Sequence, residues 1–170
     1  MIRLYSVLIL IFRQHFARYL DARTAFFYTA TGVTPAMAAK AVVGQGSQYA
    51  VATTDAGDNY FDGGKQYRLH LPPHIPAKTF WSVIVYDSQT RSILQTDQPG
   101  ADVSSEGGSV KPNADGSVDV YFGPSAPVGH EGNWIQTLPG KGWFTFFRLY
   151  GPLEPWFDQS WRLPDIELIR

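Results

Sequence analysis

Cysteine is absent from this 170-residue chain. Its absence excludes disulfide bonds, thiolate nucleophiles and thiolate metal sites, although it says nothing about the redox compartment. Charge is sparse as well, because charged residues make up 17% of the chain and the formal net charge is -1. With no block of basic residues, the composition argues against a nucleic acid or an anionic membrane as a partner.

The common catalytic motifs are also missing. The nearest approach to a G-x-S-x-G nucleophile elbow is "GPSAP" at 123–127, where prolines break the required strand-turn-helix context. No glycine-rich phosphate loop occurs. His70 and His74 are four residues apart, but two prolines lie between them and exclude the helix that would pair them on a metal. We therefore expect no cofactor and no metal site, and we interpret both histidines as surface residues.

Aromatic residues and turn formers, by contrast, are plentiful. Aromatics reach 15% of the chain, and 16 glycines and 12 prolines interrupt it. With 44% hydrophobic residues, the composition is that of one globular domain with a real core. Many turns between short apolar runs are typical of a β-sandwich or barrel.

The first quarter of the chain has a helical pattern. Apolar residues recur at helical spacing over residues 12–30, with charged residues between them. Thr34 and Pro35 suit the start of a second, short helix over 35–43, and Gly44 suits its end. We therefore divide the chain into a helical segment, 1–46, and a β-sandwich domain, 47–170.

Strand patterns follow from there to the end of the chain. Residues 79–86 and 142–150 are apolar on both faces, which predicts interior strands. The other expected strands are shorter, and they lie at 47–54, 65–71, 91–95, 117–122 and 165–169. This spacing of about eight strands favours an all-β sandwich.

The stretch "KPNADGSVDVYFG" at 111–123 carries side-chain oxygens at every second position and resembles a calcium loop. A helix-loop-helix site needs glycine at the sixth loop position and glutamate at the twelfth. Counted from Asn113, the glycine is fourth and the twelfth residue is Pro124. The pattern therefore predicts a hairpin turn that leads into a strand.

Several longer stretches resemble a known family. They are "LDARTAFFYTATGVTPAM", "FWSVIVYDSQTRSILQTDQP", "NADGSVDVYFGP", "NWIQTLPGKGWFTFFRLYGPLEPWFD" and "SWRLP". Over about residues 19–168 the chain resembles the family of domain of unknown function 1214, whose members usually follow a partner domain, domain of unknown function 1254. The resemblance implies a mainly β fold, a jelly-roll-like antiparallel β-sandwich preceded by a short helical segment. The partner domain is missing here, so we expect a standalone or truncated member.

Candidate functional residues come from the aromatic surplus and from one loop. Trp134 and Trp156 lie in loop-like contexts and are candidates for an exposed binding platform. Asn133 and Arg148 are plausible polar partners for a ligand or for a buried hydrogen-bond network. His130 and Glu131 are weak catalytic candidates, because adjacent side chains in an extended segment point apart.

These observations favour a non-catalytic binding or assembly module that uses an aromatic-rich face of the sandwich. The alternative is a hydrolase that acts on a carbohydrate or an ester with His130 near Trp134. A deep pocket in which His130, Glu131 and a third titratable group converge would favour the enzyme. A flat apolar face would favour assembly.

The N-terminal "MIRLYSVLILIF" is apolar on all sides and has to be covered by something. It is too short for a membrane span, and no small-residue cleavage site follows it. We expect self-association, or contact with a partner domain, through residues 1–16. Export or membrane attachment is the alternative, and the compartment stays open.

Overall fold

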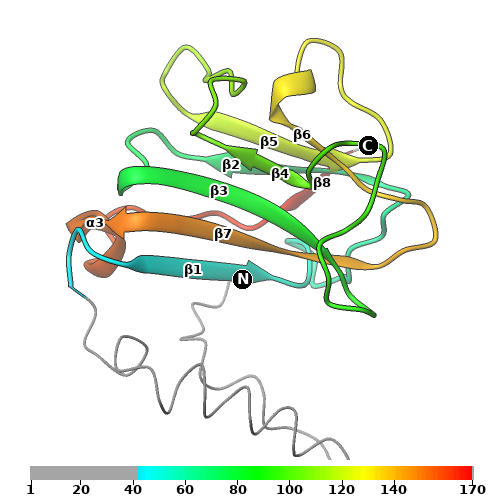
Figure 1. Cartoon of the computed structure of the whole chain (residues 1–170), viewed down its shortest axis with the longest axis horizontal. Coiled ribbons are helices and arrows are strands. Elements are labelled where there is room, and N and C mark those ends of the chain that lie inside the picture. The colour runs from blue at the N-terminus through cyan, green and yellow to red at the C-terminus, as the bar shows by residue number, and fades with distance from the viewer. Residues whose placement is uncertain (1–41, 170) are drawn as a thin grey trace, which may run out of the picture. The chain divides into compact units, whose positions relative to one another are not determined.

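The computed structural model describes residues 42–169. In this part of the chain, eight strands form two four-stranded sheets that lie face to face (Figure 1). The predicted helices at 12–30 and 35–43 lie outside the described residues, apart from the last two positions of the second. The expected mainly β, two-sheet fold is confirmed.

The first sheet is antiparallel throughout and has the strand order β1-β7-β3-β4. Its strands are β1 (Ser47–Ala52), β7 (Trp143–Pro152), β3 (Ala77–Asp87) and β4 (Asp102–Ser104). The two long strands predicted to be interior, β3 and β7, are the central pair of this sheet. The sequence predicts this interior position because residues 79–86 and 142–150 are apolar on both faces.

The second sheet has the order β6-β5-β2-β8. Its strands are β6 (Trp134–Gln136), β5 (Val118–Gly123), β2 (Gln66–Leu71) and β8 (Glu167–Ile169), which lies at the edge as predicted. The expectation of a purely antiparallel sandwich needs correction here, because β6 runs parallel to β5. A parallel neighbour requires a crossover connection, and residues 124–133 provide it. The jelly-roll winding stays a prediction.

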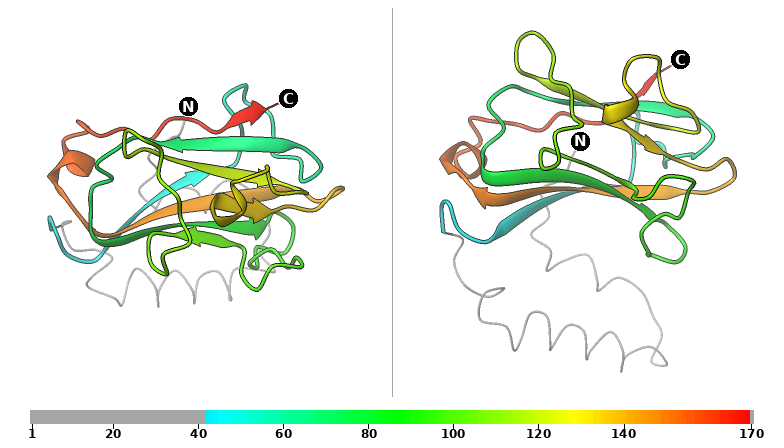
Figure 2. Two further views of the ribbon diagram at one scale, coloured as in Figure 1. Left: turned by 90° about the horizontal axis from the view of Figure 1, so that it is seen from above. Right: turned by 45° about the horizontal axis from the view of Figure 1, so that its top comes forward.

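Strand alternation explains how the two sheets form one core. In β2 the buried residues are Tyr67, Leu69 and Leu71, and in β7 Phe147 and Leu149 point inward. Each strand thereby contributes one face to the space between the sheets, which Figure 2 shows as two layers. Every second residue is left on an outer face, where the candidate sites lie.

An aromatic cluster fills one part of this core. The ring of Trp143 stacks on Phe61 at 4.0 Å between centroids and on Phe122 at 4.9 Å, and it meets Tyr67 edge-on at 5.5 Å. Four of the five tryptophans are buried, the exception being Trp134. Much of the aromatic surplus in the sequence therefore belongs to the core.

The structure differs from the predicted strands in three places. Residues 91–95 form no full strand, and Ile93 makes only an isolated bridge to Tyr86. Strand β4 lies in a stretch that looked like a polar loop, and β6 was not expected. Both are three residues long, too short for a period of two to be recognisable.

The stretch at 111–123 is a turn that leads into β5, as predicted. The backbone N–H of Gly116 donates to the carbonyl of Asn113 at 2.9 Å, and that of Asn113 donates to the carbonyl of Ser117 at 2.8 Å. It is not a hairpin, because β5 pairs with β2 and β6 and no strand precedes the turn.

Candidate functional site

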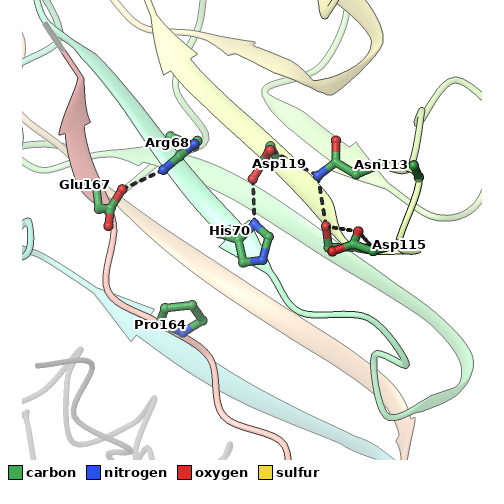
Figure 3. Close-up of a pocket in the computed structure, with 9 residues that line it drawn as sticks. Arg68, His70, Asn113, Asp115, Asp119, Pro164 and Glu167 are labelled. Carbon is green, nitrogen blue, oxygen red and sulfur yellow. Dashed lines mark hydrogen bonds and ion pairs between the residues drawn. The ribbon is translucent and has the colours of Figure 1, made fainter.

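A polar groove opens on the outer face of the second sheet (Figure 3). Its volume is about 630 Å³. Strands β2, β5 and β8, the turn before β5 and the segment before β8 all contribute to it. The residues that line the polar groove are Arg68, His70, Asn113, Ala114, Asp115, Ser117, Asp119, Pro164 and Glu167.

His70 and Asp119 form the centre of the polar groove. They are direct cross-strand partners in the β2–β5 register, so their side chains leave the sheet on the same side. The imidazole Nδ1 lies 2.7 Å from Asp119 Oδ1. The Asp119 side chain is 14% exposed and that of His70 is 42% exposed, so the carboxylate is enclosed while the ring faces solvent.

The turn before β5 holds Asp119 from its other side. The Asn113 amide Nδ2 donates to Asp119 Oδ2 at 3.1 Å and to Ser117 Oγ at 2.9 Å. The Ser117 hydroxyl donates in turn to Asp115 Oδ1 at 2.6 Å. That hydroxyl, together with the Ser117 backbone N–H, lowers the pKa of Asp115 below its ordinary value.

Arg68 forms an ion pair at one end of the polar groove. Its Nη2 donates to Glu167 Oε2 at 2.8 Å, across the β2–β8 pairing. This hydrogen bond raises the pKa of Arg68 above its ordinary value. Both side chains are well exposed, so the pair contributes little stability by itself.

The outer face of the first sheet has a different chemistry, and we call it the aromatic face. Its residues point away from the core and are half-buried. They are Tyr49 and Val51 of β1, Phe80, Ile84 and Tyr86 of β3, and Phe144, Phe146, Arg148 and Tyr150 of β7. Cross-strand stacking orders them: Tyr86 lies on Phe144 at 5.3 Å and Phe80 on Tyr150 at 4.0 Å between ring centroids.

Arg148 is the one cation on the aromatic face. Its guanidinium carbon lies 5.7 Å from the ring centroid of Tyr49, 5.9 Å from that of Tyr86 and 5.8 Å from that of Phe146. Its Nη2 also donates to the hydroxyl of Tyr86. Within residues 42–169 no carboxylate pairs with Arg148, and its buried Nε has no hydrogen-bond partner.

The structure does not bring the catalytic candidates into the polar groove. The His130 ring lies 4.9 Å from the ring of Tyr121, and Glu131 starts the short 3-10 helix η3 (Glu131–Asn133). Glu131 Oε1 accepts from the backbone N–H of Gly129 at 3.0 Å. Hydrogen bonds from its own backbone N–H and that of Gly129 lower the pKa of Glu131. Neither residue lines the polar groove.

The binding candidates do not form one exposed surface. Trp156 belongs to the short helix α3 (Glu154–Phe157) and is 6% exposed, so it offers little surface to a ligand. Trp134 is half-buried and donates from Nε1 to the carbonyl of Gly123 at 3.0 Å. Asn133 is 1% exposed and belongs to a buried hydrogen-bond network. Its Oδ1 accepts from the Lys111 N–H at 2.8 Å, and Nδ2 donates to the Lys111 and Asp119 carbonyls.

Reasoning from sequence missed the polar groove. His70 was placed correctly on the polar face of its strand but interpreted as a lone surface residue. Asp119 was recognised only as one of the alternating residues of a strand. The pairing depends on the register between β2 and β5, which are separated by 46 residues from the end of one to the start of the other and carry no local signal of alignment. No group of three or more metal-ligating residues that could hold a metal ion is found in the described part of the chain.

Comparison with known proteins places this chain in a family. The family model described as "Protein of unknown function (DUF1214)" matches residues 46–154. The chain belongs to this family. The match begins one residue before β1 and ends at the first residue of α3, so it takes in seven of the eight strands of the sandwich. No curated protein matches the chain.

One solved structure supports the fold of this family member, and a second is similar at a lower score. The VPA0106 protein from Vibrio parahaemolyticus is similar with a TM-score of 0.63 and 19% identity, over 73% of this chain and 31% of that one. A putative uncharacterized protein from Burkholderia cenocepacia is similar with a TM-score of 0.48 and 17% identity, over 76% of this chain and 32% of that one. The chain thus spans about a third of the length of either protein. Among residues 42–169, no helix has the length and apolar character needed to cross a membrane.

Proposed function

We propose that this family member is an assembly module that pairs with a second copy of itself through the aromatic face. The observation that carries the proposal is Arg148, a cation among aromatic rings that has no carboxylate partner within the described residues. Tyrosine, phenylalanine and arginine are enriched in protein interfaces, and tyrosine and arginine dominate their hot spots.

The apolar character of this face supports a protein partner. Outer faces of antiparallel sheets are normally solvated and polar, so that strands alternate between apolar and polar residues. Along β7, however, Phe144, Phe146 and Tyr150 all lie on the outer side. Complete burial of a large apolar side chain is worth about 1.5–3 kcal/mol, and a partner that covers these half-buried rings would supply the remaining part.

Charge complementarity favours a second copy over an unrelated protein. Ile84 of β3 pairs with Asp102 of β4, and Val103 next to it is buried, so Asp102 lies on the same outer side as Arg148. Strand β3 separates β7 from β4, which puts about 10 Å between the two strands. The same surface thus carries one cation and one exposed carboxylate on opposite sides of β3.

Such a surface is complementary to itself. A two-fold axis that runs along β3, in the plane of the interface, places β7 of one copy over β4 of the other. Arg148 of each copy then approaches Asp102 of the other copy, the outer residues of the two β3 strands meet along the axis, and the aromatic residues of β7 pack over β4 of the other copy. An isologous interface has this property, because each contact occurs twice.

A charge swap tests the proposal. Sedimentation velocity over a dilution series measures the dissociation constant of the dimer in the chain without residues 1–12, where association through that segment is removed, for the wild-type residues, Arg148→Glu, Asp102→Lys and the double variant. We expect each single reversal to raise the dissociation constant tenfold or more, because close interfacial charge pairs couple by about 1.5 kcal/mol or more and each pair occurs twice. The double variant restores attraction and returns the constant to within about threefold of the wild-type value.

Matched controls are available away from the aromatic face. Arg162→Glu and Asp97→Lys reverse the charge of exposed residues, and we expect neither to change the dissociation constant. A wild-type chain that is monomeric at every concentration overturns the proposal. Failure of the double variant to recover, with both single variants folded by circular dichroism, rejects the Arg148–Asp102 contact.

A further inference from the structure

The His70–Asp119 pair presents a reactive imidazole nitrogen to the polar groove. A carboxylate only accepts hydrogen bonds, so the 2.7 Å contact at Nδ1 requires this nitrogen to carry the proton. In the neutral ring the lone pair then resides on Nε2. The ring is 42% exposed and lines a groove of about 630 Å³, so an incoming ligand can reach it.

The surroundings hold the ring in this tautomer. Asp119 is itself fixed by the amide of Asn113 at 3.1 Å, and Asn113 is fixed by Ser117 at 2.9 Å. A histidine that donates from Nδ1 to a carboxylate is fixed in orientation and presents Nε2, as in a catalytic triad, and histidine is itself among the side chains that form covalent intermediates. An isolated surface histidine has none of these constraints.

We infer that His70 is an acyl-accepting nucleophile for small neutral or cationic esters that enter the polar groove, with Asp119 as its positioning residue. Nε2 attacks the ester carbonyl carbon, and the alkoxide leaves with the bonding electron pair and takes up a proton from water, which becomes hydroxide. The ring is then an N-acylimidazolium, whose positive charge Asp119 stabilises across Nδ1–H. Hydroxide adds to the acyl carbon and expels the neutral imidazole with its Nδ1–H, which yields the carboxylic acid and regenerates His70.

The charged residues of the polar groove favour neutral or cationic esters over anionic ones. Three carboxylates line it, from Asp115, Asp119 and Glu167, against the single guanidinium of Arg68, which is already paired with Glu167. This excess of negative charge repels an ester that is itself anionic. The inference is independent of assembly through the aromatic face, because the polar groove lies on the opposite sheet.

p-Nitrophenyl acetate is a suitable probe, since release of p-nitrophenolate reports the first step. We expect His70→Gln to lower the protein-dependent rate about tenfold or more, and Asp119→Asn to lower it by a similar factor, in the range of positioned acid–base and nucleophilic groups. His74→Asn serves as the matched control and leaves the rate unchanged. Asparagine is chosen at position 74 because His74 has a φ of 59°.

A second measurement does not depend on any variant folding. Nitrogen-15 NMR of the wild-type imidazoles shows which ring nitrogen carries the proton, and we expect the Nδ1–H tautomer for His70. An anionic p-nitrophenyl ester of succinic acid reacts more slowly than the acetate. The inference is overturned if His70→Gln hydrolyses acetate as fast as the wild type, or if His70 carries its proton on Nε2.

Discussion

The Asp87 carboxylate is held by one ammonium group and two backbone amides. At the end of β3, its Oδ2 accepts from Lys141 Nζ at 2.9 Å, and its Oδ1 accepts from the backbone N–H of Gln89 at 2.7 Å and of Thr90 at 3.1 Å. The Lys141 ammonium group and these two amides lower the pKa of Asp87 to about 2. The carboxylate thereby fixes the turn after β3 to the loop before β7.

This carboxylate predicts a dependence of stability on pH. Because its pKa is lower in the folded chain than the ordinary 3.8, Asp87 stabilises the fold fully above about pH 4. That contribution disappears as the pH falls from about 4 to 2. We expect Asp87→Asn to be less stable at neutral pH and to show a flatter loss of stability over this interval, measured by urea unfolding at each pH. Asp58→Asn, at an exposed carboxylate, serves as the control. An unchanged pH profile in Asp87→Asn would contradict the assignment.

His70 and Arg148 show that the contacts of a single residue depend on which strands lie beside it. His70 has a carboxylate partner only because β2 and β5 align it with Asp119, and Arg148 has none among residues 42–169 although it lies in a sheet with Asp102. Residue type alone does not distinguish the two situations. For this reason the sequence could name Arg148 as a plausible polar partner but could not say what it would bind.

At the scale of elements, a close backbone approach joins the loop before β2 to the loop before β7. Gly63 donates from its N–H to the Lys141 carbonyl at 2.9 Å, and its own carbonyl accepts from Thr137 Oγ1 at 2.9 Å. A Cβ at this position would lie 2.1 Å from the Leu138 carbonyl oxygen and 2.8 Å from that of Lys141. Only glycine fits between these two backbone segments.

Neighbouring glycines give a matched test of this approach. We expect Gly63→Ala to lower the free energy of unfolding by about 3 kcal/mol or more, because backbone has to move to admit the methyl group. At Gly64 the nearest atom to a new Cβ is a flexible carboxylate oxygen at 3.4 Å, so Gly64→Ala should change stability by less than about 1 kcal/mol. Chemical denaturation of both variants measures the difference. If both substitutions changed the free energy of unfolding by less than about 1 kcal/mol, the close approach of the two loops at Gly63 would not be needed for stability.

Strand length explains which elements the sequence could predict. Strands β3 and β7 are 11 and 10 residues long, and their apolar character on both faces is recognisable in the sequence. Strands β4 and β6 have three residues each and exist because a longer neighbour offers free hydrogen-bonding groups. Their formation is decided by tertiary pairing rather than by local preference.

At the scale of the whole molecule, two separate surfaces are expected to take part in self-association. The apolar sequence at residues 1–16 predicts self-association, and the aromatic face is proposed to pair independently of it. We expect the full-length chain to form assemblies larger than a dimer and the chain without residues 1–12 to form a dimer. The truncated chain with Arg148→Glu should be a monomer.

Light scattering coupled to size-exclusion chromatography measures the three masses in detergent-free buffer. If truncation leaves the mass unchanged, residues 1–12 take no part in association. If the full-length chain stays in solution only with detergent, attachment to a membrane replaces self-association as the role of this segment. A full-length chain that is already a detergent-free monomer contradicts both interfaces.

The sequence by itself determined the mainly β class, the two central strands and the turn before β5, because alternation, apolar runs and glycine positions are local properties of the chain. It also carried the family motifs. Only the tertiary structure decided which side chains meet. The polar groove depends on the β2–β5 register, and the aromatic face depends on β1, β7 and β3 lying side by side although they are far apart in sequence. Strand alignment is a long-range property fixed by packing of the whole core, so no single stretch of residues encodes it.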